Sequence, residues 1–274
     1  MKNFSTLLSI GLFGLYVASA HADQISVLGT ADSFAVLGAS TVTNTGPTVL
    51  SGNLGVYPGT AITGFPPGIV INGSTYAGTA TAMTAQADAL NGYTYLAGLA
   101  PTQVLTGQDL GGLVLAPGVY FFASSAQLTG PLTLDFGGVN DANIVFQIGS
   151  TLTTASGSTV SVINQGLNDN VYYQIGSSAT LGTNSLFAGD ILANTSITLT
   201  TGVDISCGAA IALNGAVTLD SNKVTNCSST GSNVTPVGSG GTGPIAPTPE
   251  PGSLVLLGTS LLGAAGVLRQ RVLA

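Results

Sequence analysis

The segment Phe146-Gln147-Ile148-Gly149-Ser150 returns almost unchanged as Tyr173-Gln174-Ile175-Gly176-Ser177. After it, the pairs Thr180-Leu181, Thr198-Leu199 and Thr218-Leu219 recur at intervals of 18 and 20 residues. Apolar positions alternate along these segments, and they show no helical periodicity. A repeat near 20 residues with this alternation predicts a solenoid of short β-strands, one coil per repeat.

The N-terminal part follows the same pattern. Thr45-Gly46-Pro47-Thr48-Val49-Leu50-Ser51-Gly52 aligns in character with Thr201-Gly202-Val203-Asp204-Ile205-Ser206-Cys207-Gly208. We therefore expect residues 40–56 to form a coil of the same solenoid.

One segment departs from the strand pattern. Residues 76–99 are rich in Ala, lack β-branched alternation and stop before Pro101, which predicts one α-helix. Its apolar stripe, expected to pack on the coils, consists of Met83, Ala87, Leu90 and Ala97. The alternative is a ligand site formed by Met83, Tyr93 and Tyr95.

The composition argues against most catalytic chemistry. Residues 23–248 contain ten Asp and one Lys, without Arg, Glu, His or Trp. General acid/base catalysis and metal-assisted chemistry draw on the missing groups, so we expect no enzyme, no cofactor and no metal site. Asn140-Asp141 and Asn168-Asp169-Asn170 are typical of turns. With net charge −7 and Lys223 as the single base of this region, nucleic acid is not an expected partner.

The two ends are predicted to be processing segments. Lys2, the apolar run 4–17 and the small residues 18–22 indicate a signal peptide over residues 1–22, leaving a domain of residues 23–227. The apolar run is short for the alternative, a membrane-spanning helix. Residues 228–247 have the composition of a flexible Ser/Gly/Pro linker.

Residues 248–274 resemble the PEP-CTERM sorting signal of Gram-negative bacteria. The box Pro249-Glu250-Pro251 is followed by an apolar segment, residues 253–268, and by Arg269 and Arg271. The resemblance implies transient membrane contact, processing by an exosortase-type enzyme, and an extracellular or cell-surface location. A permanent membrane anchor is the alternative.

The two cysteines fit the repeat. Cys207 and Cys227 are 20 residues apart, one coil, so they are expected on neighbouring turns within reach of a disulfide. Two buried free thiols are the alternative. A catalytic cysteine is not expected, because no His or Arg of this region is available to stabilise a thiolate.

From Phe34 to Thr225 the chain resembles the ice-binding family known as DUF3494. The resemblance rests on the early Thr-Gly-Pro-Thr coil, the Ala-rich helix, the Leu115–Tyr120 turn, the repeated Gln-Ile-Gly-Ser and the closing segment Leu213–Asp220. It implies an all-β dominated fold, a discontinuous right-handed β-helix of triangular cross-section with one long α-helix alongside. It also implies that the coil around Thr45 inserts among later coils, and that one flat Thr/Ser-rich face binds an ice crystal surface.

The resemblance also suggests which residues contact ice. Some members carry Thr, Ala or Gly, any residue, then Thr or Asn on successive coils. Thr45-Gly46-Pro47-Thr48 matches fully, Thr201-Gly202-Val203-Asp204 in part, and the segments starting at Thr154 and Thr183 less well. The ice-binding candidates are Thr45, Thr48, Thr154, Ser156, Thr183, Ser185, Thr201 and Asp204.

The residues themselves support this function. Stacked coils repeat an outward side chain as a straight row, and β-branched Thr has few rotamers, so such a row is a rigid lattice. A rigid lattice can order water before it meets ice. The alternative is a structural or adhesive protein of an extracellular (biofilm) matrix, because a repetitive exported solenoid suits that role too.

Overall fold

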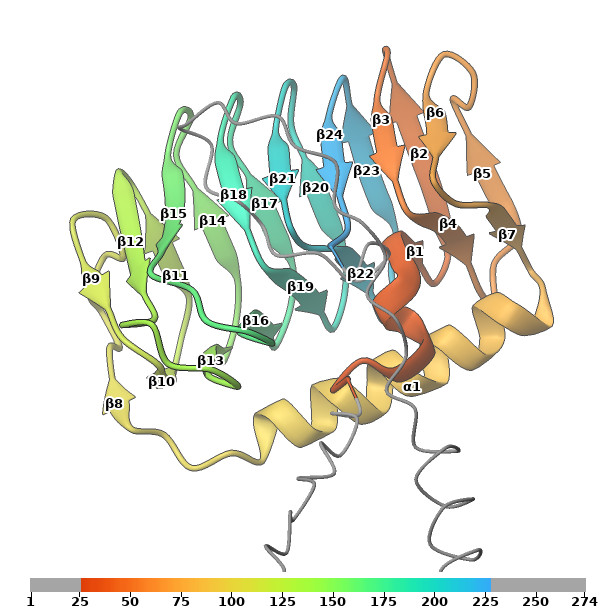
Figure 1. Ribbon diagram of the computed structural model, residues 1–274. Helices are drawn as coiled ribbons and strands as arrows, with labels where there is room; N and C mark the ends of the chain where they lie inside the picture. The colour runs from red at the N-terminus through yellow and green to blue at the C-terminus, as the bar shows by residue number, and fades with distance from the viewer. Residues whose placement is uncertain (1–25, 228–274) are drawn as a thin grey trace, which may run out of the picture. The chain divides into compact units, whose positions relative to one another are not determined.

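The computed structural model describes residues 26–227, which form a stack of β-coils with one helix alongside (Figure 1). Each complete coil contributes one strand to each of three sheets, here called A, B and C, and all strand pairs are parallel. The predicted β-solenoid is confirmed. The signal peptide, the linker and the sorting signal predicted at the ends lie outside the described residues.

The strands are listed in spatial order. Sheet A contains β7 (Thr75–Ala77), β4 (Asn53–Val56), β1 (Phe34–Gly38), β22 (Ala210–Ala212), β19 (Asp190–Ala193), β16 (Asn170–Ile175), β13 (Asn143–Ile148), β10 (Gly118–Phe122) and β8 (Gln103–Val104). Sheet B contains β5 (Ala61–Thr63), β2 (Thr41–Thr45), β23 (Val217–Asp220), β20 (Ile197–Leu199), β17 (Ala179–Leu181), β14 (Leu152–Thr154) and β11 (Ala126–Leu128). Sheet C contains β6 (Ile69–Ile71), β3 (Val49–Ser51), β24 (Lys223–Thr225), β21 (Asp204–Ser206), β18 (Leu186–Ala188), β15 (Thr159–Ile163), β12 (Pro131–Asp135) and β9 (Val114–Leu115). The helices are η1 (Gly29–Ser33) and α1 (Ala80–Ala97).

The repeated segments that indicate the solenoid fill its core. Phe146 and Tyr173, the first residues of the two copies, stack with their ring centroids 4.7 Å apart. Tyr120 and Phe187 extend this stack on either side. The neighbouring Gln147 donates from Nε2 to the carbonyl oxygens of Leu96 and Leu99, at 2.7 and 2.9 Å, and so satisfies the C-terminal end of α1. The same short motif therefore packs the interior and fixes the helix.

Helix α1 covers sheet A, but not through the predicted stripe. The buried face of α1 consists of the small residues Ala82, Ala85, Ala89 and Gly92 together with Gln86 and Leu96. Gln86 Nε2 donates to the carbonyl oxygen of Ala212 in sheet A at 3.1 Å. Met83 and Leu90 are 44% and 53% exposed, and Ala87 and Ala97 are exposed as well, so that prediction is wrong. Small side chains let α1 approach its neighbours closely: a Cβ on Gly92 would lie 2.6 Å from the carbonyl oxygen of Val27, in the segment that precedes η1. The helix is also shorter than residues 76–99, because residues 75–77 form β7.

The N-terminal coils stack on the last C-terminal coil. In sheet A, β1 pairs with β22 on one side and with β4 on the other. The coil around Thr45 lies between two coils that come later in the chain, because β2 pairs with β23 on one side and with β5 on the other. The expected insertion among later coils is confirmed. The predicted alignment is confirmed, because Gly46 and Gly202 both have positive φ, 76° and 73°, in equivalent turns between sheets B and C.

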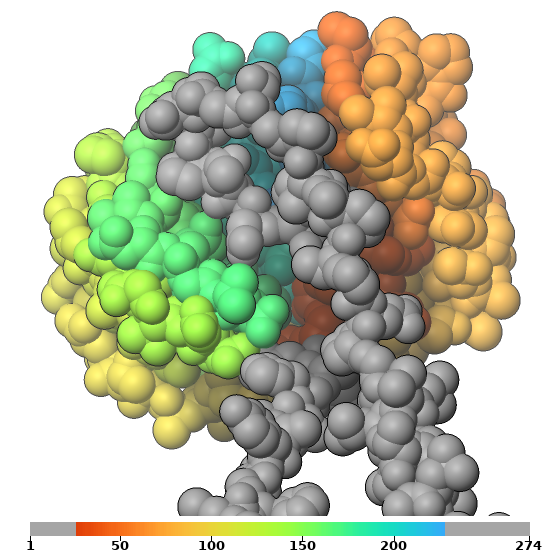
Figure 2. Space-filling view, viewed as in Figure 1, coloured from red at the N-terminus to blue at the C-terminus, as the bar shows by residue number. Residues whose placement is uncertain are grey.

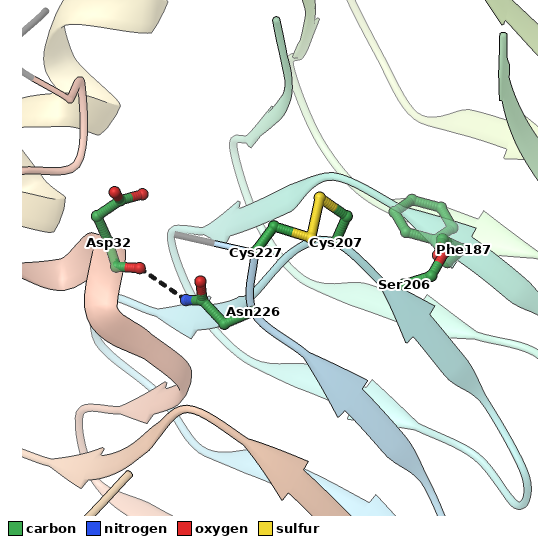
Figure 3. Close-up of a disulfide and its surroundings, with 6 residues drawn as sticks. All are labelled: Asp32, Phe187, Ser206, Cys207, Asn226 and Cys227. Atoms are coloured by element: carbon green, nitrogen blue, oxygen red, sulfur yellow. Dashed lines mark hydrogen bonds between the residues drawn. A yellow bond between two sulfur atoms is a disulfide. The ribbon is translucent and has the colours of Figure 1, made fainter. Parts of the chain in front are cut away.

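Asn226 joins the two ends of the described chain. Its Nδ2 donates to the carbonyl oxygens of Asp32 and Phe34, at 2.7 and 2.8 Å, and its backbone N–H donates to Ser51. Figure 3 shows this junction beside the disulfide between Cys207 and Cys227. The predicted disulfide is confirmed, with the two Cα atoms 4.7 Å apart on neighbouring coils.

One largely buried carboxyl lies on the outer side of sheet A. Burial raises the pKa of Asp190 from its ordinary value of 3.8 to about 8. The negative charge of Asp32 in η1 adds to the rise, and a hydrogen bond with the Ala209 backbone opposes it. The folded protein therefore keeps this carboxyl protonated at pH values where the unfolded chain has released the proton.

Replacing Tyr173 by Phe should stabilise the protein by about 1 kcal/mol, because the buried Tyr173 hydroxyl has no hydrogen-bond partner among the described residues. The matched change Tyr120→Phe should instead destabilise by about 1 kcal/mol, because the Tyr120 hydroxyl donates to the Ala116 carbonyl oxygen at 2.7 Å. Urea denaturation of both variants measures the difference. Equal losses in the two variants would contradict this account of the aromatic stack.

Asp190 should make stability fall with rising pH. Because its folded pKa is raised, the folded state binds the extra proton between about pH 4 and pH 8, and the cost of losing it is fully present above pH 8. Asp190→Asn should flatten the decline and raise the unfolding midpoint at pH 8. Asp135→Asn is the control, since hydrogen bonding with Asn164 lowers the Asp135 pKa and confines its effect to acid pH. Denaturation midpoints from pH 4 to pH 9 decide between the two.

Candidate functional site

Sheet B carries a straight row of threonines. In strands such as β17 the first and third residues, Ala179 and Leu181, point inward, so the threonine between them points outward. The strand register places one outward threonine from each of six strands side by side on consecutive coils. We call this row the Thr ladder, in spatial order Thr153, Thr180, Thr198, Thr218, Thr43 and Thr63.

The ladder is regular and uncharged. Neighbouring parallel strands lie about 4.8 Å apart, so each hydroxyl and methyl group recurs at that interval. Thr43 and Thr198 are partly exposed and the other four residues are exposed. Gln127 continues the row at the β11 end. Across the seam between the chain's two ends, Thr43 Oγ1 still lies 3.5 Å from Thr218 Oγ1, so the row runs through the junction without a break.

A row of small uncharged residues flanks the ladder two positions upstream, in spatial order Thr151, Ser178, Ser196, Ala216, Thr41 and Ala61. Hydrogen bonds hold several of these hydroxyls: Thr151 Oγ1 donates to Ser125 Oγ at 2.8 Å, and Ser196 Oγ accepts from the Ala216 backbone N–H at 3.2 Å. Ser178 Oγ accepts from the backbone N–H of Ser196. The flanking row is therefore ordered by its own contacts and widens the flat uncharged surface.

Carboxylates stay at the margin of sheet B. Asp220, at the end of β23, accepts a hydrogen bond from Thr201 Oγ1 and another from Ser221 Oγ. Asp109 accepts a hydrogen bond from Thr129 Oγ1 at 2.8 Å at the β11 end of sheet B. Both acids are held by neighbouring hydroxyls rather than placed among the threonines.

The other two sheets differ from sheet B. Helix α1 and η1 cover sheet A, whose outward residues Val145, Tyr172, Leu192 and Ile211 are buried. Sheet C is mixed: Lys223 and Asp204 form an ion pair at 3.4 Å, and Leu186 is 53% exposed beside them. Within residues 26–227, sheet B is thus the uncovered sheet with a uniform surface.

The candidates predicted from sequence lie at the corner between sheets B and C. Thr45, Ser156 and Thr201 are exposed there, and Thr183 is partly exposed and donates to Thr200 Oγ1 at 3.3 Å. Thr48, Thr154 and Ser185 are 0%, 3% and 0% exposed, so their hydroxyls cannot meet a surface ligand. Asp204 lies on sheet C in its ion pair. The segments do not share one orientation: Thr45 points out and Thr48 points in, whereas Thr154, the first residue of its segment, is buried. Asp204, the fourth residue of its segment, is partly exposed. The aligned motif therefore mixed two environments.

The buried candidates hold the corner instead. Thr48 Oγ1 donates to Asn44 Oδ1 and accepts from the Asn222 backbone N–H at 3.0 Å. Ser185 Oγ lies 3.1 Å from Thr154 Oγ1 and 2.6 Å from the Gly182 carbonyl oxygen. These bonds fix the turns that border the Thr ladder.

Sequence reasoning missed the ladder although its signal was present. The recurring Thr-Leu pairs at 180, 198 and 218 contribute the ladder threonines, each followed by a core leucine. Taken as a sequence pattern, these pairs indicate the length of the repeat but not which side chain of each strand points outward. Thr43, Thr63 and Thr153 lack that signature and become neighbours only through the strand register.

The described residues were also compared with the requirements of a membrane-spanning helix and of a metal site. No helix within residues 26–227 combines the length and apolar character needed to cross a bilayer. In the same residues, no three His, Cys, Asp or Glu side chains come together as metal ligands could.

The fold and this surface define a parallel β-solenoid with a helix on one sheet and a threonine row on another. A family model described as "Ice-binding-like" matches residues 36–225. The chain belongs to this ice-binding-like family.

Individual relatives agree with that membership. The chain is 52% identical to an ice-binding protein of Nostoc sp. (strain HG1), an alignment that covers 98% of this chain and 96% of the relative. A crystal structure of an ice-binding protein from the Antarctic ascomycete Antarctomyces psychrotrophicus superposes with a TM-score of 0.69 at 40% identity, covering 72% of this chain and 96% of that one. An ice-binding protein from an Arctic yeast, described as having antifreeze activity, gives a TM-score of 0.66 at 28% identity over 81% and 96%.

Thr48→Val should destabilise the protein by about 1–3 kcal/mol, because it leaves the buried Asn44 amide and the Asn222 N–H without their partner. The matched change Thr180→Val, at an exposed ladder position, should cost less than about 0.5 kcal/mol. Urea unfolding of both variants measures the two costs. A neutral Thr48→Val would show that the corner does not depend on this hydroxyl.

Proposed function

We propose that this chain is an exported ice-binding protein that adsorbs to ice crystals through the Thr ladder and its flanking row on sheet B. The observation that carries the proposal is the register of six outward threonines on consecutive coils of an uncovered sheet. The ice-binding names of its relatives support the same reading.

The mechanism follows from rigidity. A Thr side chain on a strand has few rotamers, and the packed core beneath sheet B keeps the backbone in place. Holding an ordered water costs about 0–2 kcal/mol, and a preorganised surface meets that cost before docking. Adsorbed molecules then block crystal growth between them. This role requires no catalysis, cofactor or metal.

The absence of charge in the ladder matters because ionised side chains hold water in their own geometry. Asp109 and Asp220 stay at the margin, and the Lys223–Asp204 pair lies on another sheet. Of the sequence-predicted candidates, Thr45, Ser156, Thr183 and Thr201 border the surface and remain proposed contacts. Thr48, Thr154, Ser185 and Asp204 are excluded from it by their burial or their position on sheet C.

The location and finer shape are part of the same proposal. Export is supported by the signal-like residues 1–22 and by the Cys207–Cys227 disulfide, a bond typical of oxidising compartments. The tail after residue 227 supports sorting to the surface of a Gram-negative cell with removal by an exosortase-type enzyme. Three strands per coil and the family resemblance support a right-handed coil of triangular section.

Thr198→Lys should abolish ice activity, lowering recrystallisation inhibition by at least an order of magnitude, because a hydrated ammonium then stands in the middle of the ladder. Ser161→Lys is the control, since Ser161 is equally a small polar residue but lies exposed on β15 of sheet C. Both variants are made in residues 23–227, assayed for ice shaping and recrystallisation, and checked for an unchanged unfolding midpoint.

The opposite pattern, with Thr198→Lys active and Ser161→Lys inactive, would place the ice-binding surface on sheet C. An unsubstituted protein that binds polysaccharide or cells and leaves ice growth untouched would favour the structural or adhesive matrix role instead.

A further inference from the structure

The two ends of the solenoid are built differently. At one end lies the coil of residues 57–79, here called the end coil, which contains β5, β6 and β7 (Figure 1, orange). These three strands are the terminal strands of sheets B, C and A. No element within residues 26–227 pairs with their outer edges, so three strand edges remain open at one end.

The core is also open at this end. Ile62, Phe65 and Val70 point toward the core but are only partly buried. At the opposite end, the segment between β8 and β9 closes the core with its own side chains, because Leu105 and Leu110 are each only 1% exposed. Terminal repeats of solenoids normally need such a cap, and the end coil lacks an equivalent one in the described chain.

The end coil is uncharged and apolar at its rim. Residues 57–79 contain no Asp, Glu, Lys, Arg or His, in a chain whose net charge is −7. Ile69 and Ile71 on β6 are 50% and 42% exposed, and Figure 2 shows this coil as a continuous surface at one side of the molecule. Two acidic molecules can therefore meet through this end without bringing like charges together.

We infer that the end coil is a docking surface for a second copy of this chain. A two-fold axis perpendicular to sheet B and passing beside Ile62 would pair β5 antiparallel with its equivalent, so the same edge serves as both partners. The pairing would satisfy the open backbone groups of β5 and bury the exposed ends of both cores.

This arrangement rests on the proposed function for its benefit. An axis perpendicular to sheet B keeps both copies of that sheet facing the same side. Thr63 of each copy then lies beside Ala61 of the other, so the two Thr ladders form one longer surface with a sideways offset between them. Two ladders on one rigid particle bind a crystal with the avidity of a bivalent ligand. The dimer itself can be tested without ice.

The test is sedimentation velocity of the full chain over a range of concentrations, with two matched double variants. Ile69→Lys with Ile71→Lys places charges on the end coil. Leu186→Lys with Ile163→Lys places them on β18 and β15 of sheet C, at residues that are 53% and 40% exposed. We expect the unsubstituted chain and the sheet C variant to dimerise as concentration rises and the end-coil variant to stay monomeric.

Hydrogen–deuterium exchange on the unsubstituted chain gives a second reading that needs no variant. Amides of residues 57–79 should exchange more slowly as protein concentration rises, with no such change in residues 105–113. The monomeric end-coil variant should still act on ice, but at several-fold higher concentration.

A chain that stays monomeric at every soluble concentration overturns the inference, as does a dimer dissociated by the sheet C variant rather than the end-coil variant. A dimer that has no effect on ice would support this interface and contradict only the proposed function.

Discussion

Parallel strand pairing at a constant spacing is the constraint on which the rest of this molecule depends. Because each coil repeats the register of the one before, an inward residue meets an inward residue and an outward one meets an outward one. The inward rows become the aromatic and aliphatic core, including the stack of Phe146 on Tyr173. The same register turns single threonines, scattered from position 43 to position 218, into one row. Core and surface are thus two results of one geometric rule.

The three sheets then acquire different roles from what covers them. Sheet A is buried because η1 and α1 cover it, and the small residues Ala82, Ala85, Ala89 and Gly92 of α1 allow close packing. Sheet C carries an ion pair and large apolar side chains, and so lacks a regular surface. Sheet B keeps its threonines because buried hydroxyls and amides, such as those of Thr48 and Asn222, hold its border turns from inside. The shape of the sheet B surface therefore depends on polar side chains that are themselves buried.

The sequence was informative wherever a local pattern corresponds directly to a structure. The Gln-Ile-Gly-Ser repeat predicted the solenoid, the likeness of the segments at Thr45 and Thr201 predicted equivalent turns, and the 20-residue spacing predicted the disulfide. Sequence patterns failed where the orientation of a side chain depends on the element that packs against it. Met83 and Leu90 have helical spacing, but close packing selected the face with smaller residues. The turn motif did not reveal which of its threonines point inward. The position of the first coil was expected from the family resemblance and not from a local pattern, because it depends on a contact between the two ends of the described chain.

That contact separates the order of coils along the chain from their order in space. At the Asn226 junction, strands β22 to β24 stack directly against β1 to β3. The described chain therefore begins and ends in the middle of the stack of coils and not at one end of it. A circularly permuted gene that joined residue 227 to residue 26 through a short linker, and began near residue 100 after α1, would encode one uninterrupted winding from β8 to β7. The threonine row would keep its neighbours in that protein, although Thr43 would follow Thr218 in the sequence instead of preceding it.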